Sequence, residues 1–439
     1  MLNSIYKIIS NPKIFVYTVL WLMILVFFGT IAQKDIGLYA SQMKYFSSFY
    51  FLFFDYIPLP GGRITLTIMT INLASSLFKK NLWKLKKIGI IILHIGGLLL
   101  LIGLITLASA SQQNINLIGN QILNILIGMA LLISLSLINP KRFLFYAPYL
   151  YIASLVLLVL VAFFGFESHG AKRWINILSF NFQPSEMIKI TIPLMLAWLY
   201  HRLQNNINYK THIIASIILA IPCIIILTQP DLGTAILIGL AGWIIIVLAG
   251  LSLKVMVFGG FGLLLSLPYL WSMLHLYQQN RILSLIDPTR DPLGTGYHSI
   301  QSMIAIGSGG FLGKGWSYGG QTQLSFLPET STDFIFSVYG EEFGFIGIIG
   351  LFIIYFFTLY RCIYMAQKMQ NTFSRLITAS LVITLFVSTF VNIAMVSGVI
   401  PVVGAPLPFI SYGGTSMVVS LAMIGIIMSL HSHKSLIAN

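Results

Sequence analysis

Long apolar runs recur along the whole chain, and this feature restricts its fold more than any other. About 20 apolar residues in a helix cross a membrane, because each residue rises about 1.5 Å and the hydrocarbon layer is about 30 Å thick. The runs cover residues 14–33, 64–79, 88–110, 116–138, 145–166, 185–202, 211–228, 232–250, 254–275, 334–360, 376–398 and 410–430. The sequence therefore predicts an all-α polytopic membrane protein with about 12 transmembrane helices.

The composition agrees with a membrane protein and excludes several other classes. Hydrophobic residues make up 57% of the chain and charged residues 8%, whereas soluble domains have about 45–50% and about 25%. The sequence contains no HExxH, CxxC or GxSxG motif, so zinc hydrolase, thiol redox and serine hydrolase chemistry have no support. The net charge of +14 is explained by topology, as shown next, and does not indicate a nucleic-acid partner.

The charges are distributed unequally between the two sides of the predicted membrane domain. Lys and Arg accumulate in cytoplasmic loops, and a cytoplasmic N-terminus places 16 of the 25 basic residues on that side. The opposite side then receives nine basic residues and all 11 acidic residues. Both termini are therefore expected in the cytoplasm, and carboxylate chemistry is expected at the outer face.

The longest connection, residues 276–333, lies on this outer side, and two further outer segments cover 167–184 and 399–410. Connections beyond about 12–15 residues are usually functional or disordered. Residues 287–298 of the long loop are expected to be extended or turned, because prolines follow Asp287 and Asp291 and two glycines lie nearby. Asp291 stands beside Arg290 and ahead of a Gly-x-Gly turn. It is either a carboxylate held at a cleft or part of an ordinary Asp-Pro turn.

Three other polar groups are candidate site residues. Glu186 and Lys189 are spaced i, i+3 at the start of a predicted helix, and they form either a structural ion pair or the wall of a polar cavity in which Lys189 meets phosphate. Asp231 either caps the helix that follows it or belongs to a site. Lys314 lies in a glycine-rich stretch that could bind phosphate through its backbone N–H groups.

The order of the motifs carries more information than any one of them. From about residue 88 to 435 the chain resembles the SEDS family of membrane glycosyltransferases, and its RodA branch more than its FtsW branch. The matching motifs are Gly170-Ala-Lys-Arg-Trp174, Gln183-Pro-Ser-Glu186, Gln229-Pro-Asp-Leu-Gly233, Asp291-Pro-Leu-Gly-Thr-Gly-Tyr-His298, Gln301-Ser302, Gly313-Lys-Gly-Trp316, Phe326-Leu-Pro-Glu329, Thr332-Asp-Phe-Ile-Phe336, Pro401-Val-Val-Gly-Ala-Pro-Leu-Pro408 and Ser411-Tyr-Gly-Gly414. One departure is Thr330-Ser331, where the family usually has a basic residue and a histidine.

The resemblance implies a peptidoglycan glycosyltransferase that polymerises lipid II at the outer face of the bacterial inner membrane, for cell elongation and rod shape. It implies Asp291 as the catalytic base of an inverting displacement, and Mg²⁺ or Mn²⁺ as a candidate cofactor. It also implies a class B penicillin-binding protein transpeptidase and the elongation machinery as partners. The residues expected to bind substrate are Glu186, Lys189, Lys172, Arg173, Gln301, Ser302 and Lys314.

Two other functions stay open at this point. A lipid II flippase would need polar sites on both sides of the midplane and internal repeat symmetry, and the one-sided acidic residues disfavour it. A scaffold that activates a penicillin-binding protein would need no bond chemistry, and the sequence does not exclude scaffolding as an added role.

The N-terminal segment, residues 1–83, has a different resemblance. Together with Leu93-His-Ile-Gly-Gly97 it is similar to the start of ResB, a cytochrome c assembly protein. This makes His94 a candidate haem ligand, but the large outer domain and final span of ResB are missing. The sequence therefore predicts an accessory or remnant membrane segment over 1–83, without haem at His94, joined to a SEDS membrane domain over 84–439.

Overall fold

The computed structural model describes residues 87–432, apart from short gaps at 169–170, 178–179, 205, 230, 275, 287–294 and 328. The two predicted N-terminal spans, 14–33 and 64–79, lie outside the described residues. So do Asp287 and Asp291. For Lys172 and His94 the structure describes the backbone but not the side chain.

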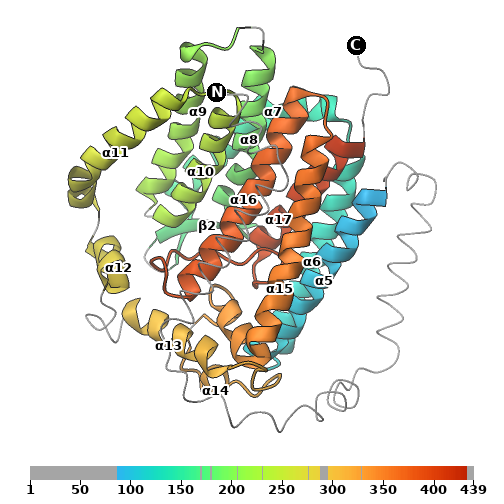
Figure 1. Ribbon diagram of the computed structural model, residues 1–439, viewed down its shortest axis with the longest axis vertical. Coiled ribbons are helices and arrows are strands. Elements are labelled where there is room, and N and C mark those ends of the chain that lie inside the picture. Colours follow the sequence, from blue (N-terminus) through green and yellow to red (C-terminus); the bar gives the residue numbers. More distant parts are fainter. Residues whose placement is uncertain are drawn as a thin grey trace.

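Ten long helices form the body of the part of the chain that the structure describes (Figure 1). Each coincides with one of the ten apolar runs predicted between residues 88 and 430, so the polytopic helical fold is confirmed. Six of them are long and apolar enough to cross a membrane. Three others contain shorter apolar stretches, which are Ile95–Ala110, Leu232–Leu248 and Leu253–Tyr269. Their bounds are α5 (Lys87–Ala110), α6 (Ile115–Leu137), α7 (Pro140–Phe164), α8 (Pro184–Arg202), α9 (Tyr209–Thr228), α10 (Leu232–Leu248), α11 (Leu253–Met273), α15 (Ile335–Gln367), α16 (Thr372–Val396) and α17 (Gly414–Ser432).

Side-chain caps begin several of these helices. The first N–H groups of a helix have no partner within the helix, and an Asn, Asp or Ser just before it can accept from them. Asn114 caps α6, Asn139 caps α7 and Asn208 caps α9. In return, the backbone N–H of Asn208 donates to the Thr211 hydroxyl. Ser252 caps α11 in the same way. These polar residues fix where the apolar runs become helices.

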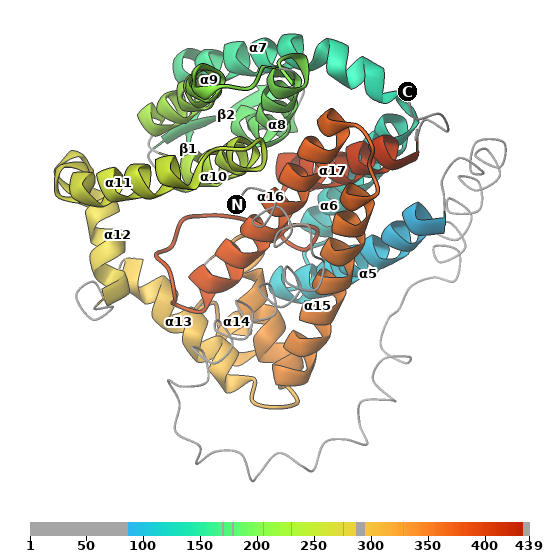
Figure 2. The same cartoon turned by 45° about the horizontal axis from the view of Figure 1, so that its top comes forward.

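The helices divide into a protein-buried core and a lipid-exposed periphery. In α16 and α17, 67% and 83% of the residues of the apolar stretch are buried, against 22% in α6. By contrast, α11 exposes large apolar side chains along its length, including Val257, Phe258, Phe261 and Leu265. Figure 2 shows α16 and α17 inside the bundle and α11 at its edge. The exposed apolar surface is the one expected to face lipid.

Small residues let helices α6 and α17 approach closely. A Cβ atom built on Gly425 of α17 would lie 2.6 Å from the carbonyl oxygen of Leu132 in α6, and one on Gly128 of α6 would lie 2.5 Å from a methyl group of Leu421. Glycine at these two positions therefore permits backbone contact between α6 and α17, as small residues do in membrane helix pairs.

The connection between α7 and α8 adds a feature that the sequence did not predict. It forms a small antiparallel sheet of β1 (Phe166–Ser168), β2 (Ala171–Ile177) and β3 (Phe180–Phe182), in the order β1-β2-β3. Trp174 pairs with Phe166, and Ile175 pairs with Phe182. This connection leaves the helical bundle, and strand pairing satisfies its backbone N–H and C=O groups.

The long connection after α11 is also more ordered than predicted. It contains α12 (Leu276–Ile286), α13 (Thr295–Ser308) and α14 (Gly320–Gln323). The expectation that residues 287–298 are extended or turned is wrong for 295–298, which begin α13. Helix α13 thus begins inside the predicted loop, with Gly296 in its first turn. The non-helical conformation predicted for 399–410 is confirmed.

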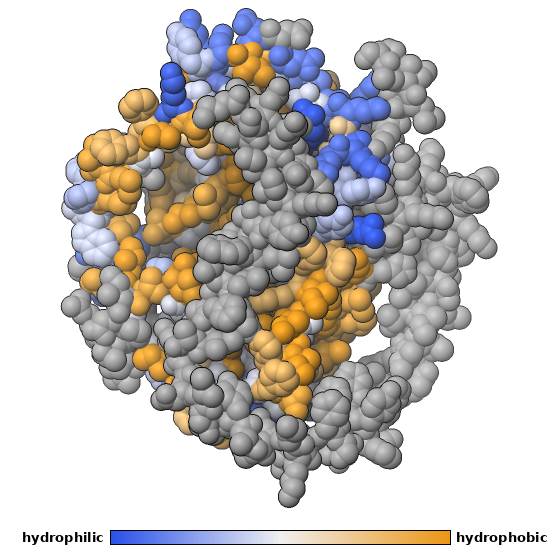
Figure 3. All heavy atoms as spheres, viewed as in Figure 1, coloured by the Kyte–Doolittle hydropathy of each residue, from blue (hydrophilic) through white to orange (hydrophobic). Residues whose placement is uncertain are grey.

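Charge separates the two ends of the bundle. The acidic end carries all seven acidic residues of the described chain: Glu167, Glu186, Asp231, Glu329, Asp333, Glu341 and Glu342. The basic end carries Lys141, Arg142, Arg202, Lys210, Lys254, Arg361, Lys368 and Arg375. Figure 3 shows hydrophilic residues gathered at the top, where α8 is joined to α9, above a broad apolar surface. The predicted charge asymmetry is thus present in the described chain.

Candidate functional site

The first two turns of α8 hold a buried ion pair at the acidic end. Lys189 Nζ lies 2.5 Å from Glu186 Oε1, and each residue is 5% exposed. The i, i+3 spacing puts both side chains on one face of the helix, and Glu186 in the first turn also complements the helix dipole. Charged groups at membrane depth are costly unless they pair. The predicted ion pair is therefore confirmed.

A second ion pair joins the small sheet to α10. Arg173 Nε on β2 lies 3.6 Å from Asp231 Oδ2, and Asp231 Oδ1 accepts from the backbone N–H of Thr234 at 3.2 Å. Asp231 is therefore the N-cap of α10, as one of its two interpretations predicted, and it also orients Arg173. The Arg173 side chain is 28% exposed at this end of the molecule.

Gln301 and Ser302 lie in the middle of α13 in unlike environments. Ser302 is wholly buried, and its hydroxyl lies 2.5 Å from the carbonyl oxygen of Val396 and 2.8 Å from the Ser337 hydroxyl. Ser302 thus joins α13 to α15 and α16, and this geometry gives its predicted role in substrate binding no support. Gln301 is half-buried.

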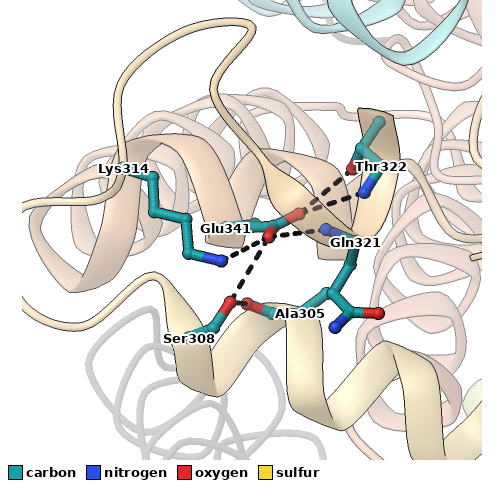
Figure 4. A network of polar contacts seen from close by, with 6 residues as sticks. All are labelled: Ala305, Ser308, Lys314, Gln321, Thr322 and Glu341. Carbon is teal, nitrogen blue, oxygen red and sulfur yellow. Dashed lines mark hydrogen bonds and ion pairs between the residues drawn. The ribbon is translucent and has the colours of Figure 1, made fainter. Parts of the chain in front are cut away.

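Lys314 is paired with a carboxylate of the protein itself. Its Nζ lies 2.6 Å from Glu341 Oε1, and Glu341 is fully buried in α15 (Figure 4). The Lys314 side chain is 29% exposed. A phosphate contact, as predicted from the glycine-rich loop, would have to compete with this ion pair.

The proline-rich segment 399–410 contacts helix α12 and is linked through Asn392 to the residues just before α15. The buried Asn392 of α16 donates from Nδ2 to the carbonyl oxygens of Asp333 and Ala405, at 2.9 and 2.7 Å. Arg281 of α12 donates to the carbonyl oxygen of Val402 at 3.0 Å. Pro401 and Val402 line a small pocket with residues of α12 and α13, the two helices that flank segment 287–294: Arg281, Ser284, Leu285 and Ser299.

The part of the chain that the structure describes contains no cluster of three or more His, Cys, Asp or Glu side chains that could hold a metal ion. The expectation of Mg²⁺ or Mn²⁺ stays a prediction. The roles of Asp291 and Lys172 also stay predictions, because their side chains lie outside the described residues.

Comparison with known proteins identifies the family. The family model for FtsW, RodA and SpoVE, described as cell cycle protein, matches residues 83–436. The chain belongs to the SEDS family.

Individual SEDS relatives match over nearly their whole length. The peptidoglycan glycosyltransferase MrdB of Escherichia coli K12 is 43% identical over 361 residues, which cover 82% of this chain and 98% of the relative. A protein of Geobacter metallireducens named probable peptidoglycan glycosyltransferase FtsW is 33% identical over 80% of this chain and 96% of the relative.

Solved structures show the same fold. A chain from a peptidoglycan synthase complex, studied for the coordination of polymerization and crosslinking, aligns with a TM-score of 0.70 and 29% identity over 79% of this chain and 98% of that chain. The rod shape determining protein RodA of Thermus thermophilus aligns with a TM-score of 0.59 and 27% identity, over 77% of this chain and 95% of that chain.

Within this SEDS chain, the sequence alone did not single out Glu341, Asn392 or Arg281 as site residues. Glu341 and Asn392 lie within long apolar runs, at 334–360 and 376–398, and buried polar residues in such runs are costly unless they have partners. The sequence therefore indicates that Glu341 and Asn392 need polar partners. It does not identify those partners, because they come from distant segments.

Proposed function

We propose that this chain polymerises lipid II into glycan strands at the outer face of the bacterial inner membrane, for cell elongation and rod shape. It is a peptidoglycan glycosyltransferase and a multi-pass membrane protein, as its family and its 43% identity to MrdB over 98% of that relative indicate. The acidic end of the bundle is then the outer face, and the basic end faces the cytoplasm.

The reaction needs a base and compensation for a leaving diphosphate. A sugar hydroxyl of the acceptor attacks the anomeric carbon of the donor, forming the glycosidic C–O bond as the bond to the diphosphate oxygen breaks. The donor has an α-linked diphosphate and the polymer is β-linked, so the displacement inverts the anomeric carbon. Asp291 would take the hydroxyl proton, and a positioned base typically contributes about 10²–10⁴-fold.

The observation that carries the proposal is the Glu186–Lys189 pair, buried at the acidic end. Lys189 would offset the negative charge that develops on the leaving diphosphate, with Glu186 fixing its position. Arg173, oriented by Asp231 on the same side of the molecule, would assist. Further substrate contacts are proposed for Lys172 and Gln301. The predicted contacts of Ser302 and Lys314 are not carried into this proposal, because Ser302 is wholly buried and Lys314 is paired with Glu341. When bound, Mg²⁺ or Mn²⁺ would supply additional positive charge at the diphosphate, and no step here depends on it.

A partner is proposed from the relatives. A chain of this fold comes from a peptidoglycan synthase complex that couples polymerization to crosslinking. This supports a complex with a class B penicillin-binding protein transpeptidase and, through it, with the elongation machinery. Scaffolding is compatible with that complex as an added role.

The decisive test measures glycan polymer formed from purified lipid II by the wild type and by Asp291→Asn. We expect polymer from the wild type and a loss of about 10²-fold or more in Asp291→Asn, because the proton acceptor is removed. Asp287→Asn is the matched control in the same segment and should retain most activity. A flippase or pure scaffold would form no polymer even as wild type. Full activity in Asp291→Asn would disprove the assignment of the base.

A further inference from the structure

Glu341 accepts hydrogen bonds from two separate parts of the α13–α15 connection. Its Oε1 receives Lys314 Nζ at 2.6 Å and the backbone N–H of Gln321 at 3.0 Å. Its Oε2 lies 3.2 Å from the Thr322 hydroxyl and 3.4 Å from the Thr322 backbone nitrogen. Ser308 Oγ, at the end of α13, lies 3.4 Å from Oε1 (Figure 4). A charged acceptor surrounded by donors in this way forms stronger bonds than a neutral one.

The backbone next to Glu341 is joined to the same connection. Helix α15 is broken at Gly344, whose φ is +64°, and a break inside a membrane helix leaves N–H and C=O groups that need other partners. The carbonyl oxygens of Glu341 and Glu342 accept from the backbone N–H groups of Lys314 and Gly315, each at 3.0 Å. In return, Phe345 and Ile346 donate to the carbonyl oxygens of residues 310 and 311, at 3.0 and 3.2 Å.

This exchange requires glycine at two positions of the chain that leaves α13. A Cβ atom on Gly313 would lie 2.0 Å from the Glu342 carbonyl oxygen, and one on Gly309 would lie 2.1 Å from the Gly340 carbonyl oxygen. The chain that leaves α13 therefore lies directly on the backbone of α15. The carboxylate of Glu341 binds the next part of that chain, residues 314–322, through the hydrogen bonds given above.

Helix α13 connects this arrangement to the segment that carries the proposed base. Asp291 precedes Thr295, the first residue of α13, by four residues. Midway along α13, Ser302 is bonded to Val396 and Ser337. The position at which the Asp291 segment enters α13 thus depends on how α13 is seated on α15.

We propose that Glu341 is a positioning residue for glycan polymerisation: it holds the α13–α15 connection on α15 and thereby sets the position of α13, whose first residue, Thr295, follows Asp291 by four residues in the sequence. The inference rests on the proposed function of Asp291. Lys314 then acts mainly as the cation of Glu341, since its ammonium lies at hydrogen-bond distance from that buried carboxylate.

The test compares polymerisation kinetics of the wild type and Glu341→Gln with lipid II as substrate. Glutamine keeps the shape of the glutamate side chain. Its NH₂ group, however, replaces a carboxylate oxygen that accepts hydrogen bonds, so it faces a donor that it cannot accept from. We expect kcat to fall by about 10-fold or more with KM changed by less than about two-fold, because misplacing a catalytic group by about 1 Å can cost about 10² in rate. Thr358→Val is the control on the same helix: this buried hydroxyl bonds within the helix, to Ile354, and should leave kcat unchanged.

A rescue experiment separates positioning from a chemical role of the carboxylate. An ideal Cβ on Gly340 lies 3.7 Å from the Cα of Ile306, close enough for a disulfide between α13 and α15. In the Glu341→Gln background, Ile306→Cys with Gly340→Cys should recover kcat when oxidised and lose it again when reduced. If Glu341→Gln does not accumulate, Thr322→Val removes one donor instead and should lower kcat by about 2- to 10-fold at unchanged KM.

Three results would overturn the inference. The first is a kcat of Glu341→Gln, or of Thr322→Val where that variant replaces it, that equals the kcat of the Thr358→Val control. The second is a loss of kcat that oxidation of the disulfide does not restore. The third is a rise in KM at constant kcat, which would assign Lys314 to substrate and Glu341 to holding it there. The absence of polymer from the wild type would instead refute the proposed function, so the two failures are distinguishable.

Discussion

At the scale of single residues, the sequence predicts charged pairs within one helix but not pairs between segments. The Glu186–Lys189 pair follows from i, i+3 spacing on a helix whose start is marked by Pro184. Lys314 and Glu341 are 27 residues apart, and the loop between them can close in many ways. Their contact depends on the break at Gly344 and on the path of the connection. Neither feature leaves a periodic pattern in the sequence.

The Glu186–Lys189 pair should act as a unit in the reaction. We expect Glu186→Gln and Lys189→Gln each to reduce polymerisation. Their combination should show a coupling energy above roughly 0.5 kcal/mol, as for residues in contact. The measurement is a double-mutant cycle on kcat/KM with lipid II. Glu186→Gln combined with Lys210→Gln, whose lysine is exposed at the basic end, should be additive. Additive effects within the Glu186–Lys189 cycle would mean that the pair is not coupled during turnover.

At the scale of elements, apolar runs predict long helices well because burial in lipid needs about 20 apolar residues in succession. All ten predicted runs between residues 88 and 430 are helices. The strands β1 and β3 have three residues each, too few for an alternating pattern to be recognised. Helices α12 and α13 lie in a connection rich in glycine, proline and charge, where turn signals dominate local sequence.

The break in α15 gives a prediction about stability. Gly344→Ala should destabilise the protein by about 1–3 kcal/mol, because alanine is strained at positive φ, and its Cβ would lie 2.2 Å from the backbone nitrogen of Gly313. The measurement is the apparent unfolding midpoint of the detergent-purified protein. Gly350→Ala is the matched control on the same helix, since nothing lies within 4 Å of its Cβ. Equal midpoints for the two variants would show that the break is not maintained.

At the scale of the whole molecule, α5 connects the N-terminal segment to the acidic end. Trp316 Nε1 donates to the carbonyl oxygen of Ile105 at 3.0 Å, and Thr330 Oγ1 donates to that of Ala110 at 3.1 Å. The hydroxyl of Ser109 bonds the Glu342 carboxylate. All three contacts lie in the last two turns of α5, far along the chain from residue 83.

Residues 1–83 are therefore expected to be dispensable for the chemistry. A chain beginning at residue 84 keeps α5 and the basic residues Lys84, Lys86 and Lys87, which anchor its start in the cytoplasm. We expect polymerisation per mole of enzyme within about two-fold of the full chain, since all the contacts above remain. The comparison requires equal amounts of each protein in the membrane.

The same preparations test the ResB resemblance. The purified full chain should show no haem absorbance, because residues 83–436, which include His94, match the SEDS family model. A stoichiometric Soret band that disappears in His94→Ala would restore the haem interpretation. Loss of activity on truncation, at normal membrane levels, would make the N-terminal segment part of the enzyme.

Helices α17 and α11 have different surroundings, protein in one case and lipid in the other, and each restricts the sequence in its own way. Helix α17 is surrounded by protein, so the volume and shape of each side chain are restricted by its neighbours. Helix α11 exposes its apolar side chains, and lipid tails accept any of them because they are fluid and lack fixed shape. Selection on α11 therefore acts on hydropathy and length, whereas selection on α17 acts on fit. The amount of sequence variation that each helix tolerates is thus set by what surrounds it.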